Sequence, residues 1–341
     1  MCGIAGFFSF KNPGASRNAS TVLREMVRSL RHRGPDSEGF YEAEGVGMGM
    51  RRLRVIDLAT GDQPIANETQ TLWIIFNGEI YNYRKLREEL KKKGARFYTE
   101  TDTEVILKLY EAKGEVCVHD LNGMYAFAIY DARRKSLFLA PDPLGIKPLY
   151  YYQDENQFLF GSVIKALLAV PGLPRILDLE AASHFLSLNY LPPPWTLFRG
   201  VRQLEGGHSL LITERGVAEK RFWNPKFETD PRLTDREAID RTRSLLRESV
   251  QSQLVADVPV GAFLSGGLDS SSLVALIKES REGGLETFSV GFEEKSYDES
   301  PYARKVARHF GTHHHELLIK PHAVGNARQV IYARARSCVL V

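Results

Sequence analysis

The order of strand-like and helical patterns changes once along the chain, and this change constrains the fold more than any other feature. Before a polar stretch with two prolines at residues 224–232, several strand-like runs, two helical patterns and more strand-like runs follow one another. After that stretch, strands and helices alternate. The first arrangement is typical of an α+β domain, and the second of a doubly wound parallel α/β sheet. The sequence therefore predicts two domains of different class.

Hydrophobic periodicity gives the approximate limits of these elements. In the first half, strands are expected at residues 2–10, 45–50, 53–58, 71–76, 124–130, 136–140, 149–152 and 157–161, and helices at 20–31, at 82–93 and from Thr101. In the second half, helices are expected from Thr234, from Ser270 and at 301–310, and strands at 258–264, 286–292 and 314–319. We place the first domain at 1–215, a linker at 216–232, the second domain at 233–320 and a divergent, disordered tail at 321–341.

Composition narrows the class of protein. The 341 residues are 43% hydrophobic and 26% charged, which is ordinary for a globular protein of about two domains. The net charge of +3 gives no electrostatic case for nucleic acid or a membrane surface. Three cysteines without a CxxC pair argue for a reducing compartment and against a zinc site. With neither a membrane-spanning run nor a leader before Cys2, we expect a cytoplasmic protein.

Cys2 directly follows the initiator methionine. If Met1 is removed, one residue carries both a thiol and a free α-amine, whose ordinary pKa is about 7.7–8.0. Such an amine acts as a base at neutral pH beside an intrinsically strong nucleophile. The alternative is a buried, unreactive cysteine.

Four further residues suit amide chemistry. Asn77 and Gly78 follow a buried strand, and an Asn amide with a Gly N–H supplies the donors that a developing oxyanion needs. Arg52 can hold a carboxylate at two points, and Asp102 can receive an ammonium group. Simpler readings stay open: an Asn-Gly turn, a solvated arginine at a strand end, and a carboxylate that complements a helix dipole.

These residues occur within a series of motifs that resembles the class II glutamine amidotransferase domain. The motifs are MCGI at 1–4, HRGPD at 32–36, RL at 52–53, NGEIYN at 77–82, TDTE at 101–104 and DPLGIKPLY at 142–150. They cover about the first 200 residues, and the resemblance implies a four-layer N-terminal-nucleophile sandwich of the α+β class.

The resemblance also implies a role for each candidate residue. Cys2 would attack the γ-amide of glutamine, and Asn77 with the Gly78 N–H would form the oxyanion hole. Arg52 would hold the glutamine carboxylate, while Glu79 and Asp102 would hold its α-ammonium. The products would be glutamate and ammonia, formed through a thioester without a cofactor.

A second candidate site lies in SGGLDSS at 265–271, between a buried strand and the start of a helix. Glycine N–H groups and a helix N-terminus make a phosphate cradle, although the Walker pattern is not met. The loop resembles the pyrophosphate loop of enzymes that adenylate a carboxylate. By that resemblance Asp269 would bind Mg²⁺, whose ligands are oxygens. The ATP contacts implied are Leu264, Ser265, Gly266, Gly267, Asp269, Ser270 and Val290.

From Met1 to about Lys320 the chain resembles the glutamine-hydrolysing asparagine synthetase family. The resemblance implies conversion of ATP, aspartate and glutamine to asparagine, glutamate, AMP and diphosphate. ATP and Mg²⁺ would serve the second half only. Motifs around Tyr297 and at His313–His315 also fit this family, and the histidines are expected to be structural because they alternate between strand faces. A homodimer is compatible with the resemblance.

Some features depart from the family pattern. Met50, Pro141, Val163 and Gly206 replace the His, Arg, Glu and Pro usual there, and none is an implied substrate contact. The family's second loop, Ser-Gly-x-Gly-x-Asp-Glu, has no counterpart. We therefore expect a truncated chain with an intact glutaminase site and an incomplete synthetase site. Two alternatives stay open: amidation of another carboxylate acceptor, or a non-catalytic remnant.

Overall fold

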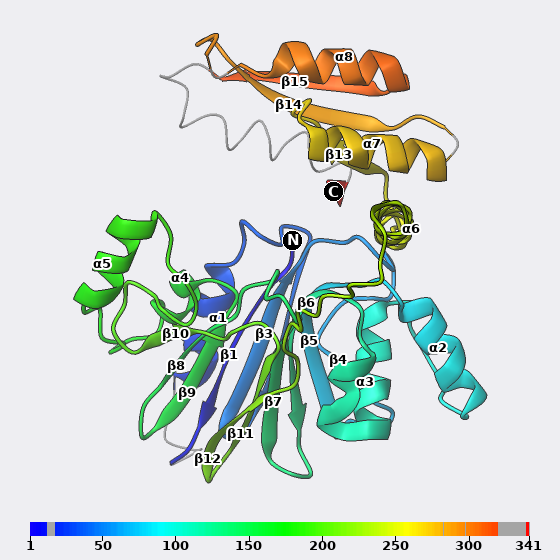
Figure 1. Cartoon of the computed structure of the whole chain (residues 1–341). Coiled ribbons are helices and arrows are strands. Elements are labelled where there is room, and N and C mark those ends of the chain that lie inside the picture. The colour runs from blue at the N-terminus through cyan, green and yellow to red at the C-terminus, as the bar shows by residue number, and fades with distance from the viewer. Residues whose placement is uncertain (12–17, 282, 297, 320–338, 341) are drawn as a thin grey trace. The chain divides into compact units, whose positions relative to one another are not determined.

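A computed structural model describes residues 1–11, 18–281, 283–296, 298–319 and 339–340 (Figure 1). The chain divides into two compact units, Met1–Lys226 and Phe227–Val341, and each unit is described separately. No helix in these described ranges is both long and apolar enough to span a bilayer.

The first unit contains two six-stranded antiparallel sheets (Figure 1). The first sheet has the order β10 (Val201–Gln203), β8 (Tyr150–Gln153), β9 (Gln157–Gly161), β1 (Gly3–Ser9), β3 (Val46–Arg52) and β2 (Ser37–Ala43). The second has the order β12 (Gly216–Arg221), β11 (His208–Thr213), β7 (Ser136–Pro141), β6 (Gly123–Asp131), β5 (Leu72–Ile80) and β4 (Ile65–Ala66).

The main core of this unit lies between the two sheets. Strand side chains alternate between faces, so one face of each sheet contributes to a shared buried cluster. That cluster includes Ile4, Met48 and Phe160 from the first sheet and Ile75 and Leu139 from the second. Both sheets therefore bury one face against the other.

Some of the helices of this unit cover the outer faces of the sheets. The helices are α1 (Ala19–Arg28), α2 (Tyr83–Lys92), α3 (Asp102–Lys113), α4 (Ile164–Leu167) and α5 (Leu179–Leu188), with a 3₁₀ helix at Gly114–Asp120. In a second cluster, Met26 of α1 and Leu167 of α4 pack on Ala5 and Leu159 of the first sheet. α3 lies against β4 and β5 of the second sheet, beside α2 (Figure 1). The observed mixture of sheets and helices confirms the α+β class predicted for the first domain.

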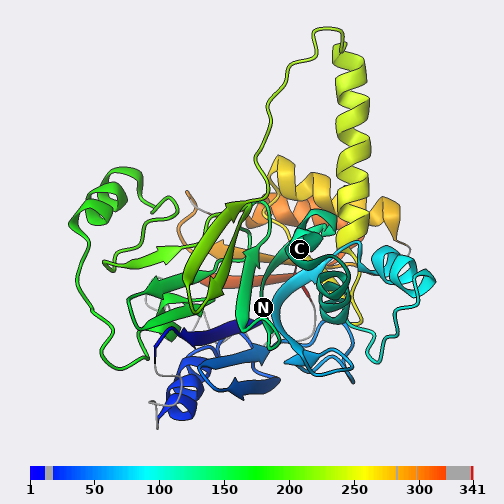
Figure 2. The same cartoon turned by 90° about the horizontal axis from the view of Figure 1, so that it is seen from below.

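The second unit contains a parallel sheet with the order β15 (His313–Ile319), β14 (Glu286–Phe292), β13 (Val260–Phe263) and β16 (Val339–Leu340). Its helices are α6 (Asp235–Gln253), which runs without interruption in Figure 2, α7 (Leu268–Ser280) and α8 (Ser300–Phe310). The predicted parallel α/β arrangement is therefore confirmed. One buried cluster joins these helices to β13, so double winding of the sheet stays a prediction.

The structure corrects the predicted linker. Residues 216–221, placed in the linker at 216–232, form β12 and pair with β11 from His208↔Arg221 to Thr213↔Gly216. Gly216 has a φ of +120°, which glycine adopts readily, and this lets the chain turn back into the sheet. The first unit consequently extends to Lys226. Of the predicted tail, Val339 and Leu340 pair with β13, and the rest lies outside the described residues.

A predicted strand at residues 53–58 is also wrong, and β2 was not predicted. Residues 53–58 form an irregular loop. Its carbonyl groups at Ile56 and Asp57 accept hydrogen bonds from the buried Arg52 side chain. Backbone acceptors that bond to a side chain are not available to a sheet ladder, which explains the missing strand.

Candidate active site

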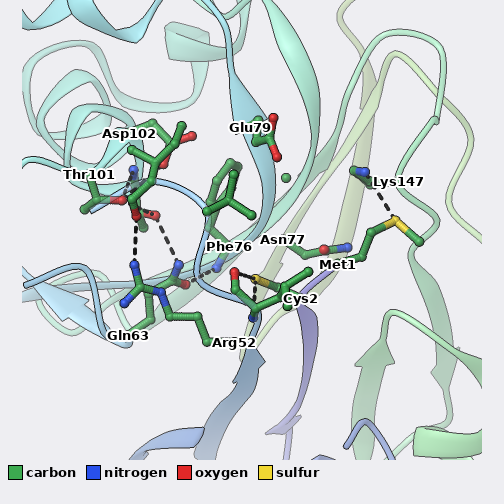
Figure 3. A pocket seen from close by; sticks show the side chains of 15 residues that line it. Met1, Cys2, Arg52, Gln63, Phe76, Asn77, Glu79, Thr101, Asp102 and Lys147 are labelled. Atoms are coloured by element: carbon green, nitrogen blue, oxygen red, sulfur yellow. Dashed lines mark hydrogen bonds between the residues drawn. The ribbon is translucent and has the colours of Figure 1, made fainter. Parts of the chain in front are cut away.

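Cys2 lies immediately before β1, at a cavity of about 50 Å³ in the first unit (Figure 3). Five parts of the chain form its wall: the N-terminus, the loop after β3, the strand β5, the start of α3, and the loop after β7. The lining residues are Met1, Cys2, Arg52, Leu53, Val55, Ile56, Gln63, Phe76, Asn77, Gly78, Glu79, Thr101, Asp102, Thr103 and Lys147. All six residues that the sequence assigned to glutamine chemistry are thus brought together.

The Cys2 thiol is held by the backbone of Leu53. Its Sγ accepts a hydrogen bond from the Leu53 N–H at 3.3 Å and donates to the Leu53 carbonyl at 3.5 Å. Arg33 Nε donates to the Cys2 carbonyl at 2.8 Å, which fixes the backbone at this point. Burial raises the pKa of the thiol. While Met1 is attached, the Cys2 nitrogen is a peptide nitrogen and cannot act as a base.

The side chain of Asn77 places a buried amide group in the wall of the cavity. Its side chain is completely buried, and neither Nδ2 nor Oδ1 has a hydrogen-bond partner within the described part of the chain. A buried amide without a partner costs roughly 1–3 kcal/mol, so such atoms need an explanation. Asn77 lies beside Cys2 and Met1 (Figure 3). A ligand that bonds to this amide is the explanation that fits its position.

Gly78 follows Asn77 on β5 and pairs with Tyr125 of β6. A Cβ atom at position 78 would lie 2.2 Å from the Met124 carbonyl oxygen, closer than any non-bonded contact allows. Only glycine therefore permits this close approach of the two strands beside the cavity.

Arg52 is buried, with 3% of its surface exposed, so the reading as a solvated strand end is wrong. Its Nη1 donates to Asp62 Oδ1 at 2.8 Å, and its Nη2 donates to the carbonyls of Ile56 and Asp57 at 2.9 and 2.7 Å. Burial alone would raise the pKa of Asp62, but bonds from Arg52, Arg54 and Ser37 lower it to about 2. The guanidinium is thus fixed in the cavity wall by a permanent anion.

Two carboxylates form the far side of the cavity. Asp102 accepts from the Ile80 N–H at 2.9 Å and from Thr101 Oγ1 at 3.1 Å, and burial raises its pKa to about 6. Burial, together with the charge of Asp102, raises the pKa of Glu79 to about 7. Two buried carboxylates that repel each other favour a bound cation. Asp102 also occupies the first turn of α3, so the helix-dipole reading holds as well.

Sequence reasoning missed two polar residues of the wall, Gln63 and Lys147. Gln63 Oε1 accepts from the Phe76 N–H at 2.7 Å, and its Nε2 donates to Thr103 at 3.1 Å, so it ties β5 to α3. No local pattern marks this glutamine. Lys147 belongs to the DPLGIKPLY motif, in which Asp142 accepts N–H bonds from the residues that shape the loop. These donors are Tyr125, Leu144, Ile146 and Lys147, at 3.0–3.1 Å.

In the second unit, the predicted phosphate loop joins β13 to α7. Gly266 has a φ of +85°, and a Cβ atom there would lie 2.5 Å from the Ala303 nitrogen. Ser265 Oγ lies 3.0 Å from Ser270 Oγ and accepts from the Gly267 N–H at 3.3 Å. The loop therefore satisfies several of its own polar groups.

A cavity of about 190 Å³ lies beside this loop, within the second unit. Its lining residues are Phe263, Leu264, Ser265, Phe288, Ser289, Val290, Glu299 and Ser300. Of the predicted ATP contacts, Leu264, Ser265 and Val290 share this cavity, whereas Gly266, Gly267, Asp269 and Ser270 lie outside its lining. Asp269 is exposed in the first turn of α7.

The three consecutive histidines alternate faces on β15. His313 and His315 bond to the two carboxylate oxygens of Glu286 at 2.9 and 2.6 Å, while His314 bonds to Thr287 and Ser289. Over the residues that the structure describes, no group of three or more His, Cys, Asp or Glu side chains could hold a metal ion. Tyr297, in the adjacent motif, lies outside those residues.

Comparisons with known proteins identify relatives of both units. Residues 1–223 match the family model described as "Glutamine amidotransferase domain", and residues 241–339 match the one described as "Asparagine synthase". Asparagine synthetase [glutamine-hydrolyzing] 1 of Bacillus subtilis is 39% identical over 94% of this chain and 50% of its own length. Asparagine synthetase B of Escherichia coli is 33% identical over 97% of this chain and 57% of its own length. The chain thus spans about half the length of these curated relatives.

A solved structure, described as the allosteric regulatory enzyme of purine biosynthesis, has a similar fold. It superimposes with a TM-score of 0.52 and 16% identity, and the match covers 93% of this chain and 80% of that one. At this identity the likeness concerns the fold alone. The amidotransferase match covers more than half of the chain, and it contains every lining residue of the cavity at Cys2. The chain therefore belongs to the glutamine amidotransferase domain family, and its second part is similar to asparagine synthase over residues 241–339.

Proposed function

We propose that the first unit hydrolyses glutamine to glutamate and ammonia, with Cys2 as the nucleophile. The observation that carries this proposal is the buried Asn77 amide, which has no hydrogen-bond partner among the described residues. It lies beside the Cys2 thiol in a cavity that also contains a fixed arginine and two carboxylates. The two facing sheets with helices on their outer faces support the finer assignment to a four-layer N-terminal-nucleophile sandwich.

Removal of Met1 activates this site. Met1 lines the cavity, and 58% of its surface is exposed, so the residue is accessible for excision. With Met1 present, the volume of about 50 Å³ is far below the roughly 300 Å³ or more that small-molecule sites offer. Excision enlarges the cavity and converts the Cys2 nitrogen into an α-amine, which can take the thiol proton.

The reaction then proceeds through a thioester. Cys2 Sγ forms a bond to the γ-carbonyl carbon of glutamine, while the α-amine accepts the thiol proton. The oxyanion accepts hydrogen bonds from Asn77 Nδ2 and the Gly78 N–H. The C–N bond breaks as the α-ammonium returns its proton to the departing ammonia. Water then attacks the thioester, which releases glutamate and restores the thiol.

Recognition of glutamine uses the two ends of the cavity. The fixed Arg52 guanidinium holds the α-carboxylate of the substrate by its charge and by the N–H groups that its bonds to the protein leave available. Glu79 and Asp102 hold the α-ammonium, and its charge stabilises the ionised form of both carboxylates.

For the second unit we propose the synthetase half of the reaction. ATP activates aspartate with release of diphosphate, and ammonia then gives asparagine and AMP. This rests on the asparagine synthase match and on the loop at the start of α7. The ATP contacts would be Leu264, Ser265, Gly266, Gly267, Asp269, Ser270 and Val290. A single exposed carboxylate suits Mg²⁺, which binds phosphates and keeps several waters; bound at Asp269, it would neutralise phosphate charge.

The glutaminase proposal is tested by measuring glutamate release from glutamine by the purified protein. The mass of the intact protein should show loss of Met1, and diazo-oxo-norleucine should label Cys2. Cys2→Ala should abolish release, and Cys117→Ala is a matched control because Cys117 is a buried cysteine outside the cavity. Retention of Met1 in active protein, or unchanged activity of Cys2→Ala, would refute the proposal. For the second unit, diphosphate release should require both ATP and aspartate. Homodimerisation and a cytoplasmic location stay predictions from the sequence.

A further inference from the structure

Lys147 is a buried cation in the wall of the cavity at Cys2. Only 5% of its surface is exposed, and its backbone N–H bonds to Asp142 at 3.1 Å. Its Nζ donates to the Met1 sulfur at 3.3 Å (Figure 3). The mechanism proposed above gives this residue no role.

The contact with Met1 is a poor match for a buried ammonium. A thioether sulfur is a weak acceptor, and a buried charge is costly unless it is paired. Burial lowers the pKa of Lys147, and Glu79 is the carboxylate that opposes this effect most strongly. The charge of Arg33 also lowers the pKa of Lys147. The charges of Asp142 and Cys2, like that of Glu79, raise it.

Glu79 needs a cationic partner in order to stay ionised. It shares the cavity with Asp102, and the like charge of Asp102 disfavours its ionised form. Lys147 and the N-terminal amine are the two groups that favour the ionised form. A neutral Glu79 could not attract the α-ammonium of glutamine by charge. Excision of Met1 removes the sulfur from Lys147 Nζ. Of the two carboxylates that share its cavity, Glu79 is the one whose charge acts most strongly on Lys147.

We propose that Lys147 is a positioning residue of the glutamine site, which pairs with Glu79 after Met1 has left and keeps that carboxylate charged for the substrate ammonium. This inference rests on the proposed glutaminase activity. It assigns Lys147 no contact with the reacting atoms, so it predicts an effect on KM rather than on kcat.

The first test compares Lys147→Met with the wild type in protein that has lost Met1. If this substitution raises the pKa of Glu79 by about one unit, KM for glutamine should rise about tenfold at pH 6.5. The value of kcat should change less than twofold. Because Glu79 ionises again at higher pH, KM should return toward the wild-type value near pH 9. Lys147→Arg should restore the wild-type profile. Lys165→Met, at an exposed lysine of α4 in the same unit, is the matched control.

The second test asks whether Lys147 acts through Glu79. In a Glu79→Gln background, Lys147→Met should have no further effect on KM. Hydrolysis of glutaramate, which lacks the α-amino group, should respond equally little to Lys147→Met in the wild-type background. An unchanged KM and pH profile for Lys147→Met would overturn the inference, as would an equal rise in KM in the Glu79→Gln background.

A measurement on wild-type sequence covers the case in which Lys147→Met does not fold. The ¹³C shift of the Glu79 carboxyl reports its titration directly, and its pKa should be lower in protein without Met1 than in protein that retains Met1. An equal or higher pKa would overturn the inference. Failure of the wild type to release glutamate would refute the glutaminase proposal instead, whereas this titration does not depend on catalytic activity.

Discussion

The two units hold their candidate site residues in different ways. In the first unit, six predicted residues line one cavity, where Arg52 is fixed by Asp62 and two backbone carbonyls, and the Asn77 amide has no partner among the described residues. In the second unit, the loop at 265–271 bonds largely to itself, and Asp269 is exposed. An unpaired buried amide costs free energy unless a ligand binds to it, whereas an exposed loop carries no such cost. The buried residues of the first site therefore indicate what kind of substrate it binds, whereas the assignment of the second site depends more on the sequence pattern.

The sharpest contrast between the two units comes from one substitution in each. Asn77→Ala removes an oxyanion donor, and we expect kcat for glutamine hydrolysis to fall roughly 10²–10³-fold. Asp269→Asn, at the start of α7, should leave glutamine hydrolysis unchanged and affect only ATP-dependent diphosphate release. Both rates can be measured on the same preparations. A fall of less than about threefold for Asn77→Ala would show that the buried amide has no part in catalysis.

The pH dependence of glutamine binding provides the next largest effect. Both carboxylates bind a cation only when ionised, and burial raises the pKa of Asp102 to about 6 and that of Glu79 to about 7. KM should be constant above pH 8 and rise about tenfold per pH unit below 7, more steeply below 6, where Asp102 also binds a proton. Steady-state kinetics from pH 5 to 9 would measure this. Glu79→Gln should remove the step near 7, and a flat profile in the wild type would contradict the assignment.

Two neighbouring glycines test how far the loop of the second unit depends on packing. Gly266→Ala places a Cβ atom 2.5 Å from the Ala303 nitrogen at a φ of +85°, and we expect a loss of about 1–3 kcal/mol in the stability of this unit. Gly267→Ala is the matched control, because its Cβ atom would lie 3.4 Å from Ser265 Oγ and its φ of −70° suits alanine. Thermal unfolding would compare them. Equal stability of the two variants would mean that the loop adapts freely.

The sequence predicted the cavity residues well for a physical reason. Short motifs display the chemical property of each of four residues. These are the terminal thiol of Cys2, the oxyanion donor of Asn77, the close approach at Gly78 and the carboxylate of Asp102 at a helix start. These properties do not depend on distant contacts. Arg52 lies in the cavity wall, but its surroundings were predicted wrongly, since two of its bonds go to carbonyl groups in a loop expected to be a strand.

Other features depend on tertiary contacts that no local pattern displays. Gln63 is a structural link only because β5 and α3 lie on either side of it. The TDTE pattern at 101–104 is typical of a capping box, but Glu104 instead accepts the N–H groups of Tyr98 and Thr99. The Thr101 side chain alone caps α3. Burial of the helix start changed the partner of this glutamate.

A capping box at the start of α6 gives the smallest expected effect and completes the comparison. Thr234 Oγ1 accepts from the Glu237 N–H at 3.3 Å, and the Glu237 carboxylate accepts from the Thr234 N–H at 3.0 Å. Both residues are exposed, unlike their counterparts at α3. Thr234→Ala should therefore speed hydrogen exchange of the first-turn amides about fivefold, while Thr234→Ser preserves their protection. The buried cluster around Val250, near the other end of α6, should not respond. If Thr101→Ala in the first unit changed exchange no more than Thr234→Ala does, burial would not strengthen a cap, and the contrast drawn between the two units would not extend to their helices.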